Sequence, residues 1–433
     1  MGSESLMGSI QALRGTRDIL PEEVRYWQWV EAIARQILDR AAYQEIRPPI
    51  FERTDLFARG IGEATDIVGK EMYTFNDRAT PPRSVTLRPE GTAGVVRALI
   101  QNNLYASGGV QRLWYTGPMF RYENPQAGRQ RQFHQLGVEV IGSADPRADA
   151  EVIAIATDIL QTLGLKNLRF DLNSVGNLED RHQYREALVN YLMPYQDELD
   201  KDSQERLTRN PMRILDSKDE RTQKITQDAP SILDYLGSDS KRHFEQVQQL
   251  LSNLGICYQL NPRLVRGLDY YTHTAFEIIS DDLGAQATVC GGGRYDGLVQ
   301  ELGGAPTPAV GWAIGLERLI ILLQQIQETP RQGLDFYVVS RGEAAEAQSL
   351  KLAQQLRQAG FSVELDLSGS AFKKQFARAS RSGAVACLIL GEEEAQTQTV
   401  QLKWMASKEQ SAIAIADLLE KADELRGQIE SLK

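Results

Sequence analysis

The stretch MFRYENPQAGRQRQFHQLGVEVI, residues 119–141, contains the pattern that decides the fold. Its second half, Phe133 to Ile141, has the length and apolar content of a buried strand, and Leu113 to Tyr115 predicts another strand before it. Between them, Asn124 to Arg131 is basic, contains a glycine and predicts a loop. Successive strands joined by short connections pair antiparallel, so we expect an antiparallel sheet rather than repeated βαβ units.

Toward the amino terminus, Val24 to Tyr43 carries apolar residues at three- and four-residue steps, which predicts an amphipathic helix. Pro21 and the acidic residues after it suit the first turn of that helix. The run Glu45 to Phe51 contains two prolines, which cannot donate the hydrogen bonds of a central strand. It therefore predicts an edge or interface strand, and Ser84 to Leu87 predicts a further short strand.

Toward the carboxyl terminus, residues 178–254 change to charged, helix-forming sequence with few β-branched side chains, which we interpret as a helical insertion. Strand-like sequence returns at Tyr258 to Leu260 and Ala275 to Ile279. The glycine-rich run Gly291 to Gly297 then leads to a helix over about residues 315–327. The core is therefore expected to resume and close after the insertion.

A second domain is predicted at the end of the chain, where short apolar runs alternate with helical runs as β-α-β-α-β. The strands are expected at Phe336 to Val339, Ser362 to Leu365 and Ala386 to Leu390, and the helices at 344–359 and 371–382. The predicted fold class is α+β: an antiparallel sheet flanked by helices over residues 1–328, with a helical insertion at about 178–256. A linker at 329–333 and an α/β domain over 334–433 complete the chain.

The composition is that of an ordinary globular protein, with 42% hydrophobic and 24% charged residues. A net charge of -10 argues against a protein that coats nucleic acid indiscriminately, but it permits local basic patches. Cys257, Cys290 and Cys387 lie far apart with no CxxC pair, which indicates a reducing compartment without disulfides or cysteine zinc sites. With no long apolar run and no signal-like start, we expect a cytoplasmic protein that neither spans a membrane nor builds a metal site.

No phosphate-binding loop of a familiar type is present, because the sequence lacks GxxxxGK[ST] and a strand-linked GxGxxG. Bound phosphate would then be held by side chains, and arginine suits this task because it binds phosphate bidentately and stays charged. The candidates are Arg88, Arg121, Arg266 and Arg318. Taken singly, each arginine is more simply interpreted as a member of an ordinary ion pair.

Three motifs in order give these arginines a context. The strand around Pro49, the run Phe120 to Glu123 with its loop to Phe133, and the run Gly311 to Arg318 resemble motifs 1, 2 and 3 of class II aminoacyl-tRNA synthetases. Any one of them is a weak signal, whereas all three at plausible spacing form a strong one.

Two further blocks, Arg266 to Glu277 and Cys290 to Leu298, resemble signatures of histidyl-tRNA synthetases, and the resemblance extends from Leu13 to about Leu425. It implies that ATP activates L-histidine as histidyl-adenylate with release of diphosphate, and that the histidine is then transferred to the 3' end of tRNA(His). ATP is a substrate in this reaction and would arrive with Mg²⁺.

The resemblance also implies residue roles. Arg121 would hold the α-phosphate and Arg266 would stabilise the charge that builds there, so these are the predicted catalytic residues. The predicted ATP contacts are Arg121, Glu123 on the adenine amino group, Phe133 stacked on the adenine, and Arg318 on the γ-phosphate. The predicted histidine contacts are Glu90, Gly91, Thr92, Arg121, Gln135, Glu139, Arg266, Tyr270, Tyr271 and Tyr295.

Within that set, Glu139 and Tyr271 would bond the two imidazole nitrogens, and Glu90, Thr92 and Gln135 would hold the α-ammonium group. A carboxylate and a phenol read both polar edges of the ring, and a ring without nitrogens would leave them unpaired. The interpretation without a ligand is a buried carboxylate beside a core aromatic. For Gly292, Gly293 and Gly311, close backbone approach to substrate competes with a simple tight turn.

The implied macromolecular partners are tRNA(His) and a second copy of the chain. Arg129 and Arg131 would contact the acceptor end, while Lys373 and Lys374 would either lie beside the anticodon or form a solvated helix face. Pro49 and its strand would be buried in a homodimer. The main alternative is the non-catalytic regulatory paralogue of ATP phosphoribosyltransferase, which shares the core fold, and a synthetase for proline, threonine or glycine is a second one.

Overall fold

The structure is a computed structural model that describes residues 10–62, 65–106, 108–280, 288–326 and 333–432. The chain forms two compact units, Met1–Thr329 and Pro330–Lys433. The predicted linker at 329–333 lies outside the described residues except for its last residue.

The first unit is built on an eight-stranded sheet with the order β1-β5-β6-β11-β10-β9-β7-β8. Its strands are β1 Gln44–Glu45, β5 Gln111–Phe120, β6 Gln132–Ile141, β7 Leu168–Ser174, β8 Gln259–Leu260, β9 Thr272–Ser280, β10 Thr288–Arg294 and β11 Ala309–Gly315. The six central strands pair antiparallel, and only the short edge strands β1 and β8 pair parallel with their neighbours. The predicted antiparallel core is confirmed.

One face of this sheet is covered by helices that bury a large apolar core. The covering helices are α1 Pro21–Arg40, α4 Pro146–Thr162, α8 Ser238–Asn253 and α10 Leu316–Ile326. Leu136, Val138 and Val140 of β6 point into this core. Because side chains alternate along a strand, Phe133, Gln135 and Glu139 of the same strand point to the opposite face.

Smaller elements border that opposite face. Three short helices lie between strands of the main sheet in the sequence: α2 Thr54–Ile61, α3 Thr92–Gln101 and α9 Leu298–Glu301. The short π-helical segment η1 Ile67–Glu71 and the small antiparallel sheet β2-β4-β3 lie between β1 and β5 in the sequence. The strands of the small sheet are β2 Phe51–Arg53, β3 Thr74–Asn76 and β4 Ser84–Leu87. The strand predicted from Glu45 to Phe51 is not continuous, because Pro48 and Pro49 separate β1 from β2.

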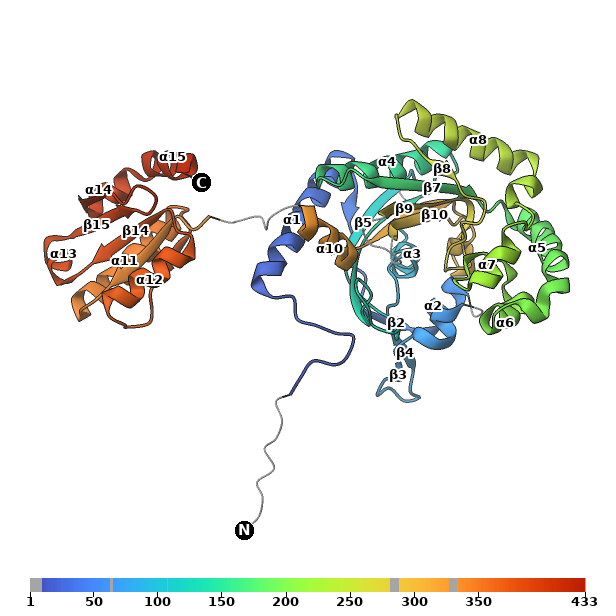
Figure 1. The fold of residues 1–433 in the computed structure, drawn as a ribbon, viewed down its shortest axis with the longest axis horizontal. Coiled ribbons are helices and arrows are strands. Elements are labelled where there is room, and N and C mark those ends of the chain that lie inside the picture. The colour runs from blue at the N-terminus through green and yellow to red at the C-terminus, as the bar shows by residue number, and fades with distance from the viewer. Residues whose placement is uncertain (1–9, 63–64, 107, 281–287, 327–332, 433) are drawn as a thin grey trace, which may run out of the picture. The chain divides into compact units, whose positions relative to one another are not determined.

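Every element between Leu178 and Asn253 is helical, which confirms the predicted insertion. The elements are α5 Leu178–Leu192, η2 Met193–Glu198, α6 Lys201–Arg209, η3 Pro211–Asp216, α7 Glu220–Thr226, η4 Ile232–Tyr235 and α8. Asn177 and Asp180 form a capping box at the start of α5, and α5, α6 and α7 lie together beside one end of the sheet (Figure 1). Helix α8 returns to the core face, where Phe244, Val247 and Leu251 are buried.

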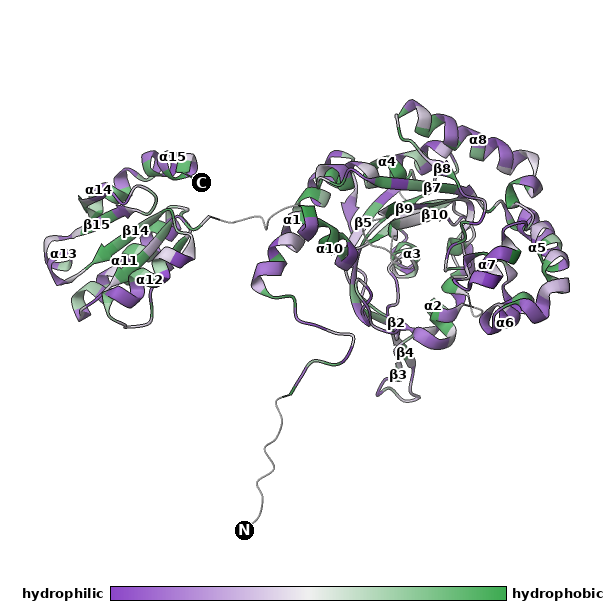
Figure 2. Ribbon diagram, viewed as in Figure 1, coloured by the Kyte–Doolittle hydropathy of each residue, from purple (hydrophilic) through white to green (hydrophobic). Residues whose placement is uncertain are grey.

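The second unit contains a five-stranded sheet with the order β13-β12-β14-β15-β16. Its elements are β12 Phe336–Ser340, α11 Glu343–Gln358, β13 Val363–Leu365, α12 Phe372–Ser382, β14 Ala386–Leu390, α13 Glu392–Thr397, β15 Thr399–Trp404, β16 Gln410–Ala414, α14 Ile415–Glu420 and α15 Ala422–Leu432. The predicted β-α-β-α-β order is confirmed, and the central strands are coloured as hydrophobic in Figure 2. The antiparallel strands β15 and β16 and the last helices were not predicted.

Candidate active site

Two adjacent strands carry glycines that face each other on the open face of the main sheet. Gly293 of β10 is the register partner of Gly311 in β11, and Gly311 is in turn the partner of Glu139 in β6. A Cβ at Gly311 would collide with the Glu139 carboxylate, and a Cβ at Gly293 would lie 2.9 Å from Tyr271 Cδ1. Glu139 of β6 therefore lies over Gly311, and Tyr271, which directly precedes β9, lies beside Gly293.

These positions correct the interpretation of the glycine run. Gly291, Gly292 and Gly293 lie inside a central strand, so the alternative of a tight turn is wrong. Glycine is unfavourable in a strand unless another group must approach the backbone closely. Side chains of this chain, rather than substrate alone, occupy that space: a Cβ at Gly291 would lie 2.6 Å from Arg266 Nη1.

Glu139 is the most enclosed acid of the site, with 1% of its surface exposed. Its Oε1 accepts hydrogen bonds from Thr92 Oγ1 at 2.7 Å and Tyr115 at 3.4 Å, and its Oε2 accepts a short one from the Tyr295 hydroxyl. Burial raises the pKa of Glu139 to about 8 even though these hydroxyls favour the charged form. The group is therefore poised to gain or lose a proton near neutral pH.

Three tyrosines form one wall beside Glu139. Tyr270, Tyr271 and Tyr295 are at most 8% exposed, and the Tyr270 ring lies 4.8 Å from that of Tyr271 and 5.5 Å from that of Tyr295. Burial raises the pKa of all three hydroxyls, so they are neutral hydrogen-bonding groups at pH 7. The predicted pair of Glu139 and Tyr271 is brought together, but the tyrosine that bonds Glu139 directly is Tyr295.

Glu90, the acidic residue predicted to hold the α-ammonium group, bonds the backbone at the start of α3. Glu90 is 3% exposed, and its carboxylate accepts from the backbone N–H groups of Thr92 at 2.7 Å and Ala93 at 2.9 Å. Gly91 lies against Tyr115, whose ring a Cβ would overlap. Gln135 Oε1 is buried and has no hydrogen-bond partner among the described residues. A buried acceptor without a donor suits a ligand that brings an N–H group.

Arg266 and Arg318 are linked through two other residues. Arg266 Nη1 makes a short ion pair with Glu277 Oε1, and Glu277 Oε2 accepts from Thr288 Oγ1 at 2.9 Å. Arg318 Nη1 donates to the Thr288 carbonyl at 2.8 Å. Burial opposes the charge on Arg266, but Glu277 outweighs it and raises the pKa of Arg266, so this guanidinium stays charged. The two predicted phosphate ligands are thus held by one network.

Arg121 lies between the two predicted substrate sites. Its Nε donates to the Pro89 carbonyl at 2.8 Å, next to Glu90, and its Cζ is 5.2 Å from the centroid of the Phe133 ring. An aromatic face that holds a guanidinium also suits a flat purine. Arg88, in contrast, is 5% exposed and donates to the Pro118 and Pro48 carbonyls, so it is a structural arginine.

The predicted acceptor-end loop makes contacts within the chain. Arg129 pairs with Glu123 at 2.9 Å, while Arg131 stacks on Tyr122 with its Cζ 3.9 Å from the ring centroid. The backbone N–H of Arg131 also donates to the Gly15 carbonyl at 2.7 Å. Glu123 is therefore shared between the predicted adenine site and the loop. In the second unit, Lys373 and Lys374 are exposed on α12.

Sequence patterns missed three members of the site. Glu277 and Thr288 hold Arg266, and Tyr115 fills the space over Gly91 and Gly137. Glu277 lies in β9 and within the predicted signature block from Arg266 to Glu277. The sequence separation of the two residues gives no sign that their side chains form an ion pair. His134 alternates with Phe133 and Gln135 along β6 and lies on the opposite face, where its ring packs against Trp27 and its Nδ1 lies 2.9 Å from Glu317 Oε1.

Three broader features of the described residues bear on the chemistry of the protein. Among the described residues, no group of three or more His, Cys, Asp or Glu side chains is placed to hold a metal ion. No helix in the described parts of the chain is long and apolar enough to cross a membrane. Cys257, Cys290 and Cys387 are all free thiols.

An antiparallel sheet with buried arginines and glycines on its open face, together with a separate α/β unit, is the architecture of the class II aminoacyl-tRNA synthetases. A family model described as histidyl-tRNA synthetase matches residues 15–319, and one described as an anticodon binding domain matches residues 335–425. The chain belongs to the histidyl-tRNA synthetase family.

Individual relatives agree with this assignment. The chain is 73% identical over 427 residues to the histidine–tRNA ligase of Crocosphaera subtropica, with 99% of this chain and 98% of that protein covered. The apo histidyl-tRNA synthetase structure from S. aureus is 40% identical with a TM-score of 0.79, covering 95% of this chain and 99% of that one. A structure from Bacillus halodurans titled ATP phosphoribosyltransferase regulatory subunit/histidyl-tRNA synthetase is 22% identical with a TM-score of 0.65 and covers 88% and 98%. At that identity it shows the fold alone.

Proposed function

We propose that this chain is a histidine–tRNA ligase that activates L-histidine with ATP and transfers it to tRNA(His). The observation that carries the proposal is that Gly293 and Gly311, register partners on two central strands, lie against Tyr271 and Glu139 respectively. A carboxyl group and a phenol can each hydrogen-bond one of the two ring nitrogens of imidazole. The chain is 73% and 74% identical, over 99% and 97% of its length, to two proteins named histidine–tRNA ligase, which supports the ligase over the regulatory paralogue.

The α-ammonium group of histidine would lie at the end of the pocket formed by Glu90, Thr92 and Gln135. Glu90 supplies negative charge, and the unpartnered Gln135 Oε1 supplies an acceptor. The histidine carboxylate would then point toward Arg121 and Arg266. Both guanidinium groups lie close to these residues, because Arg121 bonds the Pro89 carbonyl and Arg266 lies beside Tyr271.

Adenylate formation requires an in-line attack of the histidine carboxylate on the α-phosphorus of ATP. Arg121 and Arg266 would stabilise the charge that develops on the α-phosphate oxygens, and Arg318 would hold the γ-phosphate at the far end. Phe133 and Glu123 would bind the adenine. Mg²⁺ carried by ATP would neutralise phosphate charge and assist departure of diphosphate. Because the attacking carboxylate is already a nucleophile, positioning rather than proton transfer supplies most of the rate.

The test is exchange of diphosphate into ATP, measured with each of the twenty amino acids and without tRNA. Exchange with histidine alone supports both the reaction and the pocket assignment. The absence of exchange in folded protein that still binds histidine would favour the regulatory paralogue. Exchange with proline, threonine or glycine would instead favour a related synthetase.

The tRNA contacts are proposed for both units. We assign residues 1–328 to catalysis, with residues 178–256 as the insertion, and residues 334–433 to anticodon binding. Arg129 and Arg131 would have to exchange Glu123 and Tyr122 for phosphate when the acceptor end arrives. Alanine at Arg129 should therefore slow aminoacylation more than diphosphate exchange. Alanine at both Lys373 and Lys374 should weaken tRNA binding without changing diphosphate exchange.

The assembly is proposed to be a homodimer. Pro49 is exposed in the single chain, and its neighbours Ile50 and Phe51 expose 44% and 60% of their surfaces. Such exposed apolar side chains beside a short sheet are typical of a protein–protein contact. We also propose that the enzyme works in the cytoplasm, where its tRNA is used and its free thiols stay reduced.

A further inference from the structure

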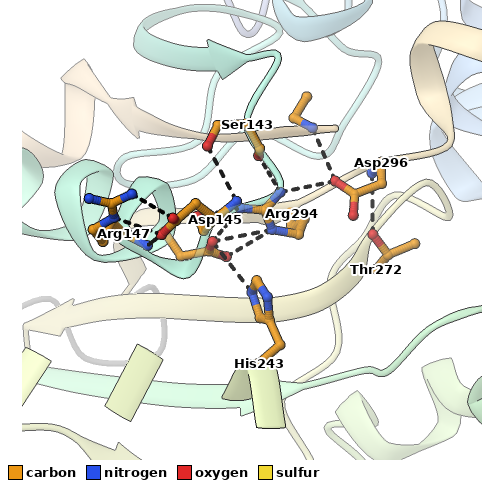
Figure 3. Close-up of polar contacts among 9 residues, drawn as sticks. Ser143, Asp145, Arg147, His243, Thr272, Arg294 and Asp296 are labelled. Carbon is orange, nitrogen blue, oxygen red and sulfur yellow. Dashed lines mark hydrogen bonds and ion pairs between the residues drawn. The ribbon is translucent and has the colours of Figure 1, made fainter. Parts of the chain in front are cut away.

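A buried arginine lies directly behind the histidine pocket. Arg294, the last residue of β10, is 1% exposed, and every nitrogen of its guanidinium donates a hydrogen bond. Nε donates to both Asp149 oxygens at 3.2 Å, and Nη2 makes a short bond to Asp149 Oδ2. Nη1 donates to the Ser143 carbonyl at 2.8 Å and to Asp296 Oδ1 at 3.1 Å (Figure 3).

The stability of the fold alone does not explain this arrangement. Removing two charges from water costs several kcal/mol per ion, and a well-packed apolar pair is often as stable as a buried ion pair. Asp149 is completely buried, which by itself would raise its pKa, yet His243 and Arg294 lower the pKa of Asp149 to about 2. The pair is therefore ionised throughout the physiological range, and its geometry is fixed by direction-dependent bonds.

The segments that Arg294 joins are those that carry the imidazole contacts. Tyr295 is the next residue, and its hydroxyl bonds Glu139. On the other chain segment, Ser143 follows Glu139 by four residues and lies two residues beyond the end of β6. The guanidinium thus connects the backbone that carries Tyr295 to the backbone that carries Glu139.

Asp296 fixes the same turn from its other end. Besides accepting from Arg294, Asp296 Oδ1 accepts from the Ala309 backbone N–H at 3.0 Å, at the start of β11. The backbone N–H of Asp296 donates to Thr272 Oγ1 at 3.2 Å, immediately after Tyr271 (Figure 3). Tyr295 therefore lies between Arg294, which bonds the segment after β6 and helix α4, and Asp296, which bonds the first residues of β9 and β11.

The helical insertion contributes a third member. His243 of α8 places Nε2 3.4 Å from Asp149 Oδ2, and its ring lies 5.2 Å from that of His273. His273 follows Tyr271 by two residues and has a positive φ of 47°, an uncommon conformation for a residue other than glycine. Through His243, helix α8 therefore contacts both Asp149 and the segment that directly follows Tyr271.

We propose that Arg294 and Asp149 are positioning residues that hold Tyr295 and Glu139 in place for histidine recognition. Because His243 of α8 contacts Asp149, this positioning also depends on the position of α8. The pair holds the Tyr295 hydroxyl at Glu139, so that the carboxyl presents its free lone pairs to an imidazole N–H. This inference rests on the proposed assignment of Glu139 and Tyr295 to the histidine pocket. It adds a role for residues that do not touch the substrate.

The first test is Arg294→Lys, which keeps the charge but loses the planar fork. In diphosphate exchange, the KM for histidine should rise at least about tenfold, while the KM for ATP changes less than about twofold. His243→Gln should raise the KM for histidine by a smaller factor. The matched control is Arg112→Lys, because Arg112 pairs with Glu151 on the same helix as Asp149 at 2.9 Å. That variant should leave both KM values unchanged.

A double-mutant cycle separates positioning from simple structural support. If Arg294 acts through Tyr295, then Arg294→Lys should raise the KM for histidine little further in a Tyr295→Phe background. Additive effects would overturn the proposal, and so would an Arg294→Lys protein with a lower Tm but an unchanged KM for histidine. Should Arg294→Lys fail to fold, Asp296→Asn removes one contact of the cluster and should show the same selective rise in KM. Tyr295→Phe and Glu139→Gln alone test the pocket assignment, because wild-type KM values in both would reject the proposed site itself.

Discussion

Thr92 Oγ1 donates a 2.7 Å hydrogen bond to Glu139 Oε1 and joins the first residue of α3 to the centre of β6. With Tyr295 on the other carboxyl oxygen, Glu139 is surrounded by hydroxyl groups rather than by cations. Hydrogen bonds from hydroxyl groups offset only part of the cost of burying a charged carboxylate, so the pKa of Glu139 rises to about 8. The proposed histidine site thus contains a carboxyl group whose raised pKa favours the protonated form at neutral pH.

The first prediction concerns stability. A carboxyl whose pKa is higher in the folded than in the unfolded protein stabilises the fold fully below the unfolded value of 4.5, and this contribution is lost as pH rises toward about 8. The loss is at most about 1.4 kcal/mol per pH unit in this interval. Glu139→Gln mimics the neutral carboxyl, so its Tm should exceed that of the wild type by a margin that grows from pH 5 to pH 8.

Asp200 offers a control of opposite sign. Burial would raise its pKa, but hydrogen bonds from Ser203, Ser217 and Thr222 outweigh burial and lower the pKa of Asp200 to about 2. Asp200→Asn should therefore lower the Tm above about pH 4 and have little effect near pH 2. Thermal unfolding of the three proteins across this pH range checks both signs. A Tm difference for Glu139→Gln that does not change with pH would show that Glu139 is already ionised.

The second prediction concerns protons released by histidine. A neutral imidazole donates its N–H best to an ionised carboxylate, so binding at pH 7.5 should release up to one proton from Glu139. Isothermal titration calorimetry in buffers of different ionisation enthalpy measures this number. Glu139→Gln should release none and should bind histidine at least tenfold more weakly. Equal proton release from both proteins would assign the proton to another group.

The sequence was sufficient to predict the architecture, because periodicity and prolines report local structure. The alternation of β6 correctly separates Glu139 from His134, and the charged stretch from Leu178 identifies the insertion. Contacts between distant segments were not predictable in this way. Nothing in local sequence connects Arg266 with Glu277 or Arg294 with Asp149, since both pairs depend on how the strands and helices pack. For the same reason, a glycine run inside a central strand could not be distinguished from a turn.

The third prediction uses those glycines. Gly311→Ala places a methyl group against the Glu139 carboxylate and the Val138 backbone carbonyl, whereas Gly291→Ala places one against the Arg266 guanidinium. Gly311→Ala should therefore raise the KM for histidine about tenfold or more with a nearly normal KM for ATP. Gly291→Ala should mainly lower kcat. Steady-state diphosphate exchange distinguishes them, and identical defects in the two variants would mean that the sheet itself is distorted.

The fourth prediction separates binding from catalysis at Arg266. Arg266→His should reduce adenylate formation by a factor on the order of 10² to 10³, as expected when charge stabilisation in the transition state is lost. Histidine binding, measured by calorimetry, should stay within several-fold of the wild type. Glu277→Gln keeps Arg266 but weakens its ion pair, so its loss of kcat should be smaller. Equal losses in binding and turnover for Arg266→His would make Arg266 mainly a substrate ligand.

The last prediction concerns assembly. Phe51 and Phe75 expose 60% and 49% of their surfaces on β2 and β3, the outer strands of the small sheet. Burying such side chains is worth roughly 1.5–3 kcal/mol each, so a charge at this place should oppose association strongly. Phe51→Asp should sediment as a monomer at micromolar concentration, where the wild type is expected to sediment as a dimer.

Leu367 provides the control for this substitution, because it is 85% exposed in the second unit and lies in none of the buried apolar clusters of that unit. Leu367→Asp adds the same charge, so it should sediment like the wild type. The monomer formed by Phe51→Asp should also lose most of its diphosphate exchange. Strand β2, which contains Phe51, pairs with β4, and β4 leads directly to Glu90 and to Thr92 at the start of α3. A wild-type protein that sediments as a monomer would reject the dimer, and a fully active Phe51→Asp monomer would show that association does not support the histidine pocket.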